Sequence, residues 1–329
     1  MRAVLCREWG GPEVLRVAEV EPPAPGPGEL RLAVHAAGVN FADLLMVAGR
    51  YQEKPPFPFS PGLEAAGTVE AVGPGVARVK PGERVLALTD RGAYAEGALV
   101  RETDVFPIPE AMDFVTAAGF AITYGTAHGA LTWRAGLQAG EVLLVHGAAG
   151  GAGLAAVEVG KALGATVIAT ARGADRLAIA RAHGADHLID TAGEDLRTRV
   201  KELTGGRGAD VVFDPVGGDV FDASLRCVAW GARLLVIGFA AGRAAQIPAN
   251  ILLVKNVSAL GFYWGSYRRR APQLVRAEFA ELFDWYAQGK LTPHVSHALD
   301  LARAAEALTL LKERKSTGKV VLTTGRSRA

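Results

Sequence analysis

The most informative stretch of the sequence, residues 141–153, reads EVLLVHGAAGGAG. Its first part is a nearly continuous apolar run of strand length, and the residues that follow are all glycine or alanine. Small residues at the start of a helix leave backbone N–H groups open to a pyrophosphate, so this order is typical of a dinucleotide-binding domain. The GxxGxxG spacing also fits a plain strand–helix turn. The residues predicted to contact a dinucleotide here are Gly147, Ala148, Gly150, Gly151, Ala152 and Gly153.

Strands and helices alternate around and beyond this stretch. The predicted strands are residues 141–146, 165–170, 187–190, 210–214, 232–238 and 258–263, and the predicted helices are residues 154–164, 175–184, 196–204 and 221–230. Short apolar strands that alternate with helices are typical of a sheet buried on both faces. The sequence therefore predicts an α/β fold with a doubly wound parallel sheet.

The first 110 or so residues are β-rich instead. Residues 30–36 and 67–73 alternate in character, as half-buried strands do. Clusters of proline and glycine at residues 22–28, 55–58 and 80–83 make helices implausible there. These features predict a small barrel-like β domain.

The chain beyond residue 265 is predicted to return to this β-rich domain. Two amphipathic helical patterns, at residues 272–289 and 302–313, precede an apolar strand at residues 319–323. We therefore expect two domains. The first combines residues 1–120 with residues 265–329, and the second comprises residues 121–264.

Composition and charge argue against several classes of protein. The 36 Lys and Arg residues nearly balance the 34 Asp and Glu residues, so a net charge of +2 argues against nucleic acid or an anionic membrane as a partner. No apolar run approaches the ~20 residues of a membrane-spanning helix, and the N-terminus lacks a secretory signal pattern. Cys6 and Cys227 match no disulfide or metal-binding spacing. These observations predict a cytoplasmic protein.

The end of the second strand of the dinucleotide domain indicates which cofactor it binds. Enzymes that bind NAD usually carry an acidic residue there, whereas this chain has Arg172, followed by Arg176 one helical turn later. Guanidinium groups suit a 2′-phosphate, so the sequence favours NADPH over NADH. Asp175 lies between the two arginines and weakens this interpretation, and a solvated helix start is the alternative.

Several segments, in order along the chain, resemble one protein family. They are residues 38–43 (GVNFAD), 61–67 (PGLEAAG), 73–76 (GPGV), 82–85 (GERV), 147–153 and 318–322 (GKVVL). Together they resemble zinc-free medium-chain dehydrogenases/reductases of the quinone oxidoreductase (zeta-crystallin) type. The resemblance implies a GroES-like β-rich catalytic domain, a Rossmann-type domain and a homodimer.

The same resemblance bears on metal binding. Related alcohol dehydrogenases hold a catalytic zinc through Cys or His at the positions that match Asn40 and Leu63, and neither asparagine nor leucine is a suitable ligand. No cysteine lies in the stretch that follows Val85, where the structural zinc lobe of those relatives would fall. We therefore expect no metal.

The resemblance also implies which side chains act on the substrate. The candidates for the reaction are Asn40, Tyr51, Tyr124 and Thr126, of which Asn40 and Thr126 are also expected to contact the cofactor. Asn40 can donate a hydrogen bond to a carbonyl group, and Tyr51 can bond to or protonate the reduced acceptor. Asp43 is predicted to be a local cap.

Further cofactor contacts are expected near the carboxyl ends of strands, where sheets of this kind bind ligands. The residues are Asp214, Val216, Gly238, Phe239, Phe262 and Trp264, and the resemblance adds Arg314. The positions of Phe262 and Trp264 also fit packing in the core. Lys319, like Arg314, matches a position near the cofactor in relatives, but lysine and arginine side chains near a C-terminus are most often only solvated.

Without a metal, hydride must pass to an acceptor that is already electrophilic. We therefore predict an NADPH-dependent quinone oxidoreductase that transfers hydride directly to a quinone bound between its domains. Some quinone reductases of the family have a second tyrosine at the place of Leu45. Its absence here keeps an alternative open, an NADPH-dependent 2-alkenal, enone or enoyl-thioester reductase with Tyr51 as proton donor. A non-catalytic NADPH-binding protein is the alternative of another class.

Overall fold

The computed structural model describes residues 1–326 and divides the chain into two compact units. Unit 1 comprises residues 1–122 together with the chain from Pro293 onward, and unit 2 comprises residues 123–292. Residues 265–292, expected in the first domain, therefore group with unit 2. The reason is a buried contact within unit 2, in which Glu278 accepts a hydrogen bond from Trp264 Nε1 at 2.9 Å and lies 3.2 Å from His128 Nδ1.

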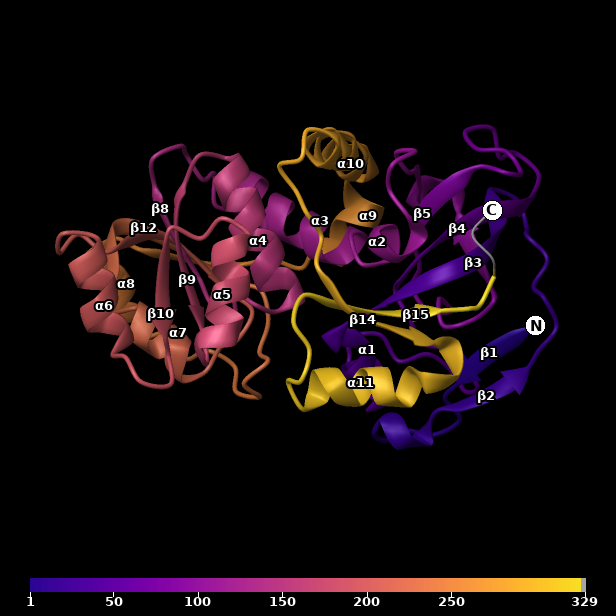
Figure 1. The fold of residues 1–329 in the computed structure, drawn as a ribbon, viewed down its shortest axis with the longest axis horizontal. Helices are drawn as coiled ribbons and strands as arrows, with labels where there is room; N and C mark the ends of the chain where they lie inside the picture. Colours follow the sequence, from indigo (N-terminus) through magenta and orange to yellow (C-terminus); the bar gives the residue numbers. More distant parts are fainter. Residues whose placement is uncertain (327–329) are drawn as a thin grey trace. The chain divides into compact units, whose positions relative to one another are not determined.

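Unit 1 is built on a seven-stranded sheet with the strand order β14-β15-β3-β4-β5-β7, and β6 also pairs with β3 (Figure 1). Its strands are β3 (Glu29–Val39), β4 (Glu64–Val72), β5 (Arg84–Leu88), β6 (Gly97–Arg101), β7 (Val105–Pro107), β14 (Val295–Asp300) and β15 (Lys319–Thr323). The strands β1 (Arg2–Leu5) and β2 (Arg16–Glu19) form a separate pair, and the helices are α1 (Phe41–Val47), α2 (Phe114–Ala118) and α11 (Ala304–Lys312). β15 pairs antiparallel with β3, which confirms that the last strand returns to the first domain.

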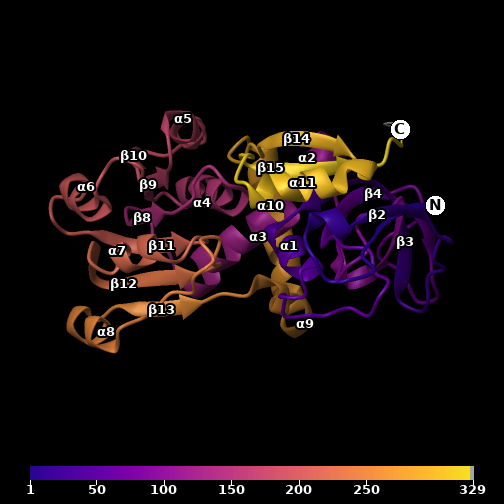
Figure 2. The same ribbon diagram turned by 90° about the horizontal axis from the view of Figure 1, so that it is seen from below.

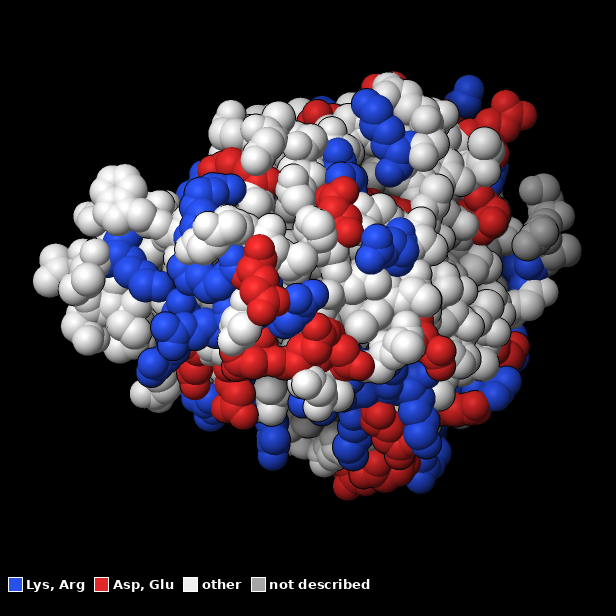
Figure 3. Space-filling view, turned by 60° about the vertical axis from the view of Figure 1, so that its left-hand side comes forward, with Lys and Arg blue, Asp and Glu red and all other residues white. Residues whose placement is uncertain are grey.

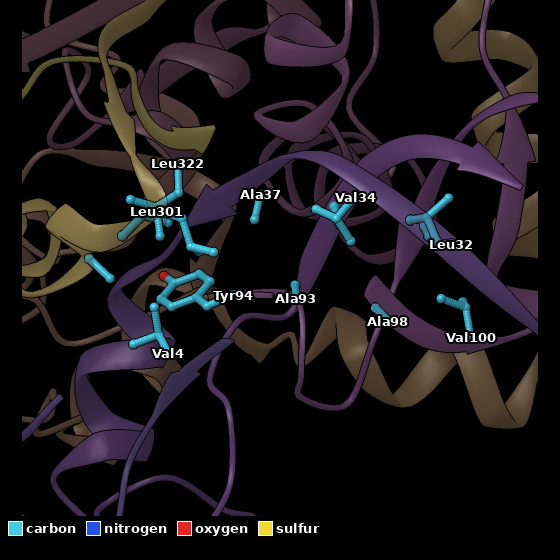
Figure 4. Packing of buried hydrophobic residues seen from close by; sticks show 14 of the residues in the cluster. Val4, Leu32, Val34, Ala37, Ala93, Tyr94, Ala98, Val100, Leu301 and Leu322 are labelled. Atoms are coloured by element: carbon cyan, nitrogen blue, oxygen red, sulfur yellow. The ribbon is translucent and has the colours of Figure 1, made fainter. Parts of the chain in front are cut away.

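The core of unit 1 follows from the alternation of side chains along β3. Leu32 and Val34 leave no exposed surface, and Leu32 pairs with Ala98 of β6 across the sheet (Figure 4). Tyr94 is also completely buried, and its ring packs in this core among aliphatic side chains, including Leu301.

Unit 2 contains a six-stranded parallel sheet with the strand order β10-β9-β8-β11-β12-β13, which Figure 2 shows one beside another. Its strands are β8 (Val142–Val145), β9 (Thr166–Ala171), β10 (His187–Asp190), β11 (Ala209–Asp214), β12 (Val228–Val236) and β13 (Ser258–Gly261). Its helices include α4 (Gly151–Ala162), α5 (Ala174–Ala182), α6 (Leu196–Leu203), α7 (Asp219–Ser224), α8 (Ala249–Lys255) and α10 (Pro272–Ala287), and α3 (Ala121–Gly129) begins at the boundary of the two units. This order is that of the Rossmann fold and confirms the predicted α/β class.

Several elements of unit 2 differ from the prediction. The helix expected at residues 221–230 ends at Ser224, because Val228 already pairs with Ala209 of β11 as the first residue of β12. The helix α8, whose residues are all exposed or only partly buried, was not predicted. Among residues 1–326, every helix is too short or too polar to span a bilayer.

Charged side chains of both signs lie on the face of the molecule that Figure 3 shows. Figure 3 shows lysine and arginine side chains interspersed with aspartate and glutamate over one face. This distribution agrees with the nearly balanced composition.

Candidate functional site

The glycine turn, defined as residues 147–153, joins β8 to the helix α4. Gly147 has a φ of +58°, in the left-handed region that favours glycine. The N–H of Gly150 donates to the carbonyl oxygen of Gly147 at 2.9 Å, and that of Ala148 donates to the carbonyl oxygen of Thr170 on β9 at 3.0 Å. No side chain caps the N-terminus of α4. The turn is thus held in one shape while the first N–H groups of the helix stay open, as an anionic group requires.

The third glycine of the turn is required by a close backbone approach. A Cβ on Gly153 would lie 2.2 Å from the carbonyl oxygen and 2.7 Å from the carbonyl carbon of Gly147. A Cβ on Gly147 would lie 3.1 Å from Cγ2 of Val216, which places Val216 beside the turn. The residues of this turn therefore fit a dinucleotide pyrophosphate.

His146, the residue before the turn, is fully buried in a polar network. Its Nε2 lies 2.7 Å from Ser224 Oγ and its Nδ1 lies 2.9 Å from Thr170 Oγ1. Because Ser224 Oγ donates its hydrogen to the carbonyl oxygen of Val220, Nε2 carries the imidazole hydrogen. Burial lowers the pKa of His146, which keeps the ring neutral. The network joins β8, β9 and α7 next to the glycine turn.

The other predicted residues at this edge of the sheet serve different purposes. Asp214 is buried, and its carboxylate accepts hydrogen bonds from the N–H groups of Val216 and Gly217, so it shapes the loop after β11. Gly238 lies after β12, where a Cβ would approach the carbonyl oxygen of Pro215 to 3.1 Å. Phe239 is 45% exposed and is available to a ligand.

Two arginines predicted to bind a 2′-phosphate follow the second strand of the sheet in sequence. Arg172 comes directly after β9 and is exposed, and Arg176 lies in the first turn of α5 and is partly buried. Between them, the N–H of Gly173 donates to Asp190 at the end of β10, which fixes the loop that carries Arg172. Asp175 is exposed in the same turn of α5.

Unit 1 gathers several buried polar side chains around Asn40, which precedes α1. Asn40 Nδ2 donates to Glu64 Oε1 at 2.8 Å, and Lys319 Nζ donates to Asn40 Oδ1 at 2.8 Å and to Glu64 Oε1 at 2.7 Å. We call Asn40, Glu64 and Lys319 the Asn40 cluster. Lys319 is only 6% exposed, so the expectation of a solvated lysine was wrong.

Glu64 was missed by the sequence analysis. Its second oxygen, Oε2, accepts a hydrogen bond from the N–H of Ile122 at 2.8 Å, and the residue is completely buried. The available signal was a carboxylate beside the apolar residues Leu63, Ala65 and Ala66 at the start of β4, because such a group is buried only with partners.

Asp43 lies next to the Asn40 cluster, and its contacts confirm the prediction that it is a local cap. Its Oδ2 accepts hydrogen bonds from the N–H of Asn40 and from the hydroxyl of Tyr94, both at 2.8 Å. The side chain is completely buried, and burial raises the pKa of Asp43 to about 7.

The remaining residues predicted for the reaction lie in different environments. Tyr51 is half-buried against the core of unit 1, and its N–H donates to the carbonyl oxygen of Leu45 at 3.1 Å. Thr126 is partly exposed on α3. Tyr124 is buried, and its hydroxyl donates to Glu158 of α4 at 2.5 Å.

Tyr124 therefore has a fixed partner. Burial and the adjacent Glu158 carboxylate raise the pKa of Tyr124 well above its usual value of 10. The same carboxylate lies 2.6 Å from His183 Nδ1 and accepts from Thr292 Oγ1 at 2.5 Å. The geometry gives Tyr124 a role in holding α3 and α4 together within unit 2.

Three further residues predicted to contact the cofactor lie away from the glycine turn in the sequence. Phe262 and Trp264 are 7% and 5% exposed, and Trp264 uses its N–H on Glu278, so the structure gives both rings a packing role. Arg314 is exposed just beyond the end of α11, with a φ of +57°.

The residues around Asn40 do not fit a catalytic zinc. Leu63 has no donor atom and packs against the core, and Oδ1 of Asn40 faces the ammonium group of Lys319. In the described part of the chain, residues 1–326, no three His, Cys, Asp or Glu side chains are grouped as a metal site would need.

Comparison with known proteins agrees with this architecture. The alcohol dehydrogenase GroES-like domain family matches residues 26–110, and the zinc-binding dehydrogenase family matches residues 151–287. The chain is 43% identical over 326 residues to a protein of Nematostella vectensis named quinone oxidoreductase-like protein 2 homolog, with 98% of this chain and 89% of that protein covered.

Two further relatives carry related names. A quinone oxidoreductase of Pseudomonas aeruginosa is 38% identical over 316 residues, with 95% of this chain and 97% of that protein covered. The crystal structure of Escherichia coli quinone oxidoreductase complexed with NADPH superposes with a TM-score of 0.91 at 31% identity, with 98% of this chain and 100% of that chain covered.

Proposed function

The chain belongs to the quinone oxidoreductase family of medium-chain dehydrogenases/reductases, and on this basis we propose that it is an NADPH-dependent quinone oxidoreductase. The observation that carries the proposal is the glycine turn, where Gly153 approaches the backbone of Gly147 too closely for any side chain. The NADPH complex of the Escherichia coli relative, which shares this fold, supports the choice of cofactor.

The pyrophosphate and the 2′-phosphate of the cofactor each have residues that would hold them. The open N–H groups at the start of α4 would bind the pyrophosphate, and Arg172 and Arg176 would bind the 2′-phosphate. When bound, NADPH supplies the hydride. The chain's own contribution is to orient the cofactor and the acceptor and to polarise the carbonyl oxygen that receives charge.

Asn40 is the residue best suited to polarise that oxygen. Its amide is held by Glu64 and Lys319, and its Nδ2 carries two hydrogens, of which Glu64 takes one. The second can be donated to a carbonyl group of the nicotinamide or of the acceptor. A fixed neutral donor of this kind stabilises developing negative charge without any cost of reorganisation.

A panel of acceptors tests the proposed function. Purified protein with NADPH is given 1,4-benzoquinone, an α,β-unsaturated aldehyde or an enoyl thioester, and the loss of NADPH absorbance is followed. We expect the quinone to be reduced fastest. Faster reduction of the enone or thioester would favour the alternative reductase, and quenching of NADPH fluorescence without oxidation by any acceptor would indicate a non-catalytic binding protein.

The variant Tyr51→Phe distinguishes a quinone oxidoreductase from an enone or enoyl-thioester reductase. For a quinone, we expect kcat to change by less than about 3-fold, because the reduced quinone oxygen can take its proton from water. For an enone that depends on Tyr51 as proton donor, kcat should fall roughly 10²-fold or more. Tyr286→Phe, on α10, is the matched control for the loss of a phenol group. A large loss with the quinone would contradict the proposed mechanism.

We also propose that two copies of the chain associate through the edge of unit 2. β13 is the terminal strand of the six-stranded sheet, and in α8, just before it, Leu253 and Val254 are each 77% exposed. Neighbouring exposed apolar side chains can mark an interaction site, and an unpaired strand edge readily pairs with another.

The variant Leu253→Glu tests this dimer. We expect the wild-type protein to sediment as two chains of 34.4 kDa and the variant as one, because a charge would be buried at the interface. The control is Leu274→Glu, which changes an exposed leucine on a different helix, α10, and should leave the dimer intact. Equal sedimentation of wild type and Leu253→Glu would exclude this edge as the interface.

A further inference from the structure

The ammonium group of Lys319 is unusual in being buried inside unit 1 with every hydrogen used. Its three hydrogens go to the carbonyl oxygen of Val39 at 3.1 Å, to Asn40 Oδ1 at 2.8 Å and to Glu64 Oε1 at 2.7 Å. Replacing a buried ion pair by apolar residues is often neutral or stabilising, so the need for stability alone does not explain why the pair is present.

The cluster determines which way the amide of Asn40 points. An ammonium group can only donate, so the Asn40 atom that faces Lys319 must be the oxygen. A carboxylate can only accept, so the atom that faces Glu64 must be the nitrogen. Rotating the amide by half a turn would set hydrogens against the ammonium group and an oxygen against the carboxylate, both inside the protein. The charged pair thus excludes the flipped amide.

The backbone around the cluster is shaped to keep it in place. A Cβ on Gly38 would lie 2.4 Å from Glu64 Oε1 and 2.2 Å from the carbonyl oxygen of Ala118, so only glycine leaves room for the carboxylate. A Cβ on Gly119 would lie 3.3 Å from Cβ of Lys319. Glu64 is held on its other side by the N–H of Ile122. The position of the carboxylate, and through it that of Asn40, is therefore closely defined.

We infer that Lys319 is a positioning residue, which with Glu64 fixes the amide of Asn40 so that its second Nδ2 hydrogen is free to be donated to a carbonyl oxygen. That hydrogen has no acceptor among the residues that the structure describes. The role in turnover rests on the proposed function, whereas the orientation of the amide does not. Lys319 itself would touch neither hydride donor nor acceptor.

Hydrogen exchange of the asparagine side chains tests the orientation without any turnover. The chain has three asparagines, of which Asn250 and Asn256 are exposed, so labelling with nitrogen-15 asparagine gives few signals. We expect one Asn40 side-chain hydrogen to exchange with water at least roughly tenfold more slowly than those of the other two, because it is buried on Glu64. In Lys319→Met this protection should disappear.

Two results would overturn the inference at this stage. One is fast exchange of both Asn40 hydrogens in the wild-type protein, which needs no variant and so holds even where Lys319→Met does not fold. The other is unchanged protection in a folded Lys319→Met. Lys315→Met, at an exposed lysine that pairs with Glu313, is the matched control and should change nothing.

A double-variant cycle tests the consequence for the reaction. Asn40→Ala and Lys319→Met should each lower kcat with 1,4-benzoquinone roughly 10²-fold, and the double variant should be no slower than Asn40→Ala. Melting temperatures are measured in parallel, because a loss of stability unrelated to Asn40 would lower kcat both in the wild-type protein and in Asn40→Ala. A double variant slower by the product of the two effects would contradict action through Asn40. If the wild-type protein reduces no acceptor, the proposed function fails, and the exchange experiment still decides the inference.

Discussion

Gly153→Ala is expected to raise the Kd for NADPH roughly 100-fold, equivalent to about 2.7 kcal/mol. The added Cβ would lie 2.2 Å from the carbonyl oxygen of Gly147 and 3.0 Å from Cα of Ala148. Both contacts are with backbone atoms, which cannot rotate away as a side chain would. The turn must therefore move, and the N–H groups at the start of α4 lose the arrangement that a pyrophosphate needs.

The measurement is a titration of NADPH fluorescence, with Gly193→Ala as the control. Gly193 also lies in unit 2, and its Cβ would meet nothing within 4 Å, so this variant should bind NADPH as the wild type does. Overpacking of a backbone contact also lowers the free energy of unfolding by about 1–3 kcal/mol. The comparison is therefore made well below the melting temperature of each variant. Binding within about 3-fold of the wild type would contradict a dinucleotide site at this turn.

The fold of unit 2 could be predicted because its signals are local. The run at residues 141–153 contains a buried strand, a turn and a helix start within a few residues, and the same order of elements then repeats. The strand at residues 319–323 was assigned to the first domain correctly, although its partner β3 lies near the other end of the chain. That assignment rested on the order of the last elements, two amphipathic helical patterns followed by an apolar strand.

The Asn40 cluster could not be predicted in the same way, because its members are far apart in the sequence. Lys319 is 279 residues from Asn40 and 255 residues from Glu64. A lysine near the end of a chain is usually solvated, and only the tertiary structure shows that a carboxylate lies opposite it. For the same reason the sequence could not show that the hydroxyl of Tyr124 donates to the buried carboxylate of Glu158.

The boundary of the dinucleotide unit was misplaced for a similar reason. The amphipathic pattern of α10 shows that one face is buried but not which partner covers it. In the structure Glu278, on that face, interacts with His128 and Trp264, and all three belong to unit 2. Glu278 indicates which unit covers this face, but its partners lie up to 150 residues away in the sequence and only the structure shows them.

Replacing Arg172 and Arg176 together by alanine should weaken NADPH binding roughly 100-fold while changing the Kd for NADH by less than about 3-fold. Two charge-assisted hydrogen bonds to a phosphate contribute about 1.5–3 kcal/mol each in a protected site, and exposure of Arg172 to solvent reduces this contribution. NADH lacks the 2′-phosphate and so loses none of it. The ratio of the two Kd values therefore reports on this one group of the cofactor.

Salt and a matched variant separate specific recognition from a general effect of charge. Raising the ionic strength should reduce the ratio of the Kd for NADH to the Kd for NADPH in the wild-type protein, because exposed charges are screened. Arg181→Ala removes one positive charge from the last turn of α5, the helix that carries Arg176, and should leave both Kd values unchanged. If the double variant loses NADPH and NADH to the same extent, the arginines support the fold of the loop held by Asp190 and do not read the phosphate. The preference for NADPH over NADH would then depend on other residues near the ends of β9 and β10.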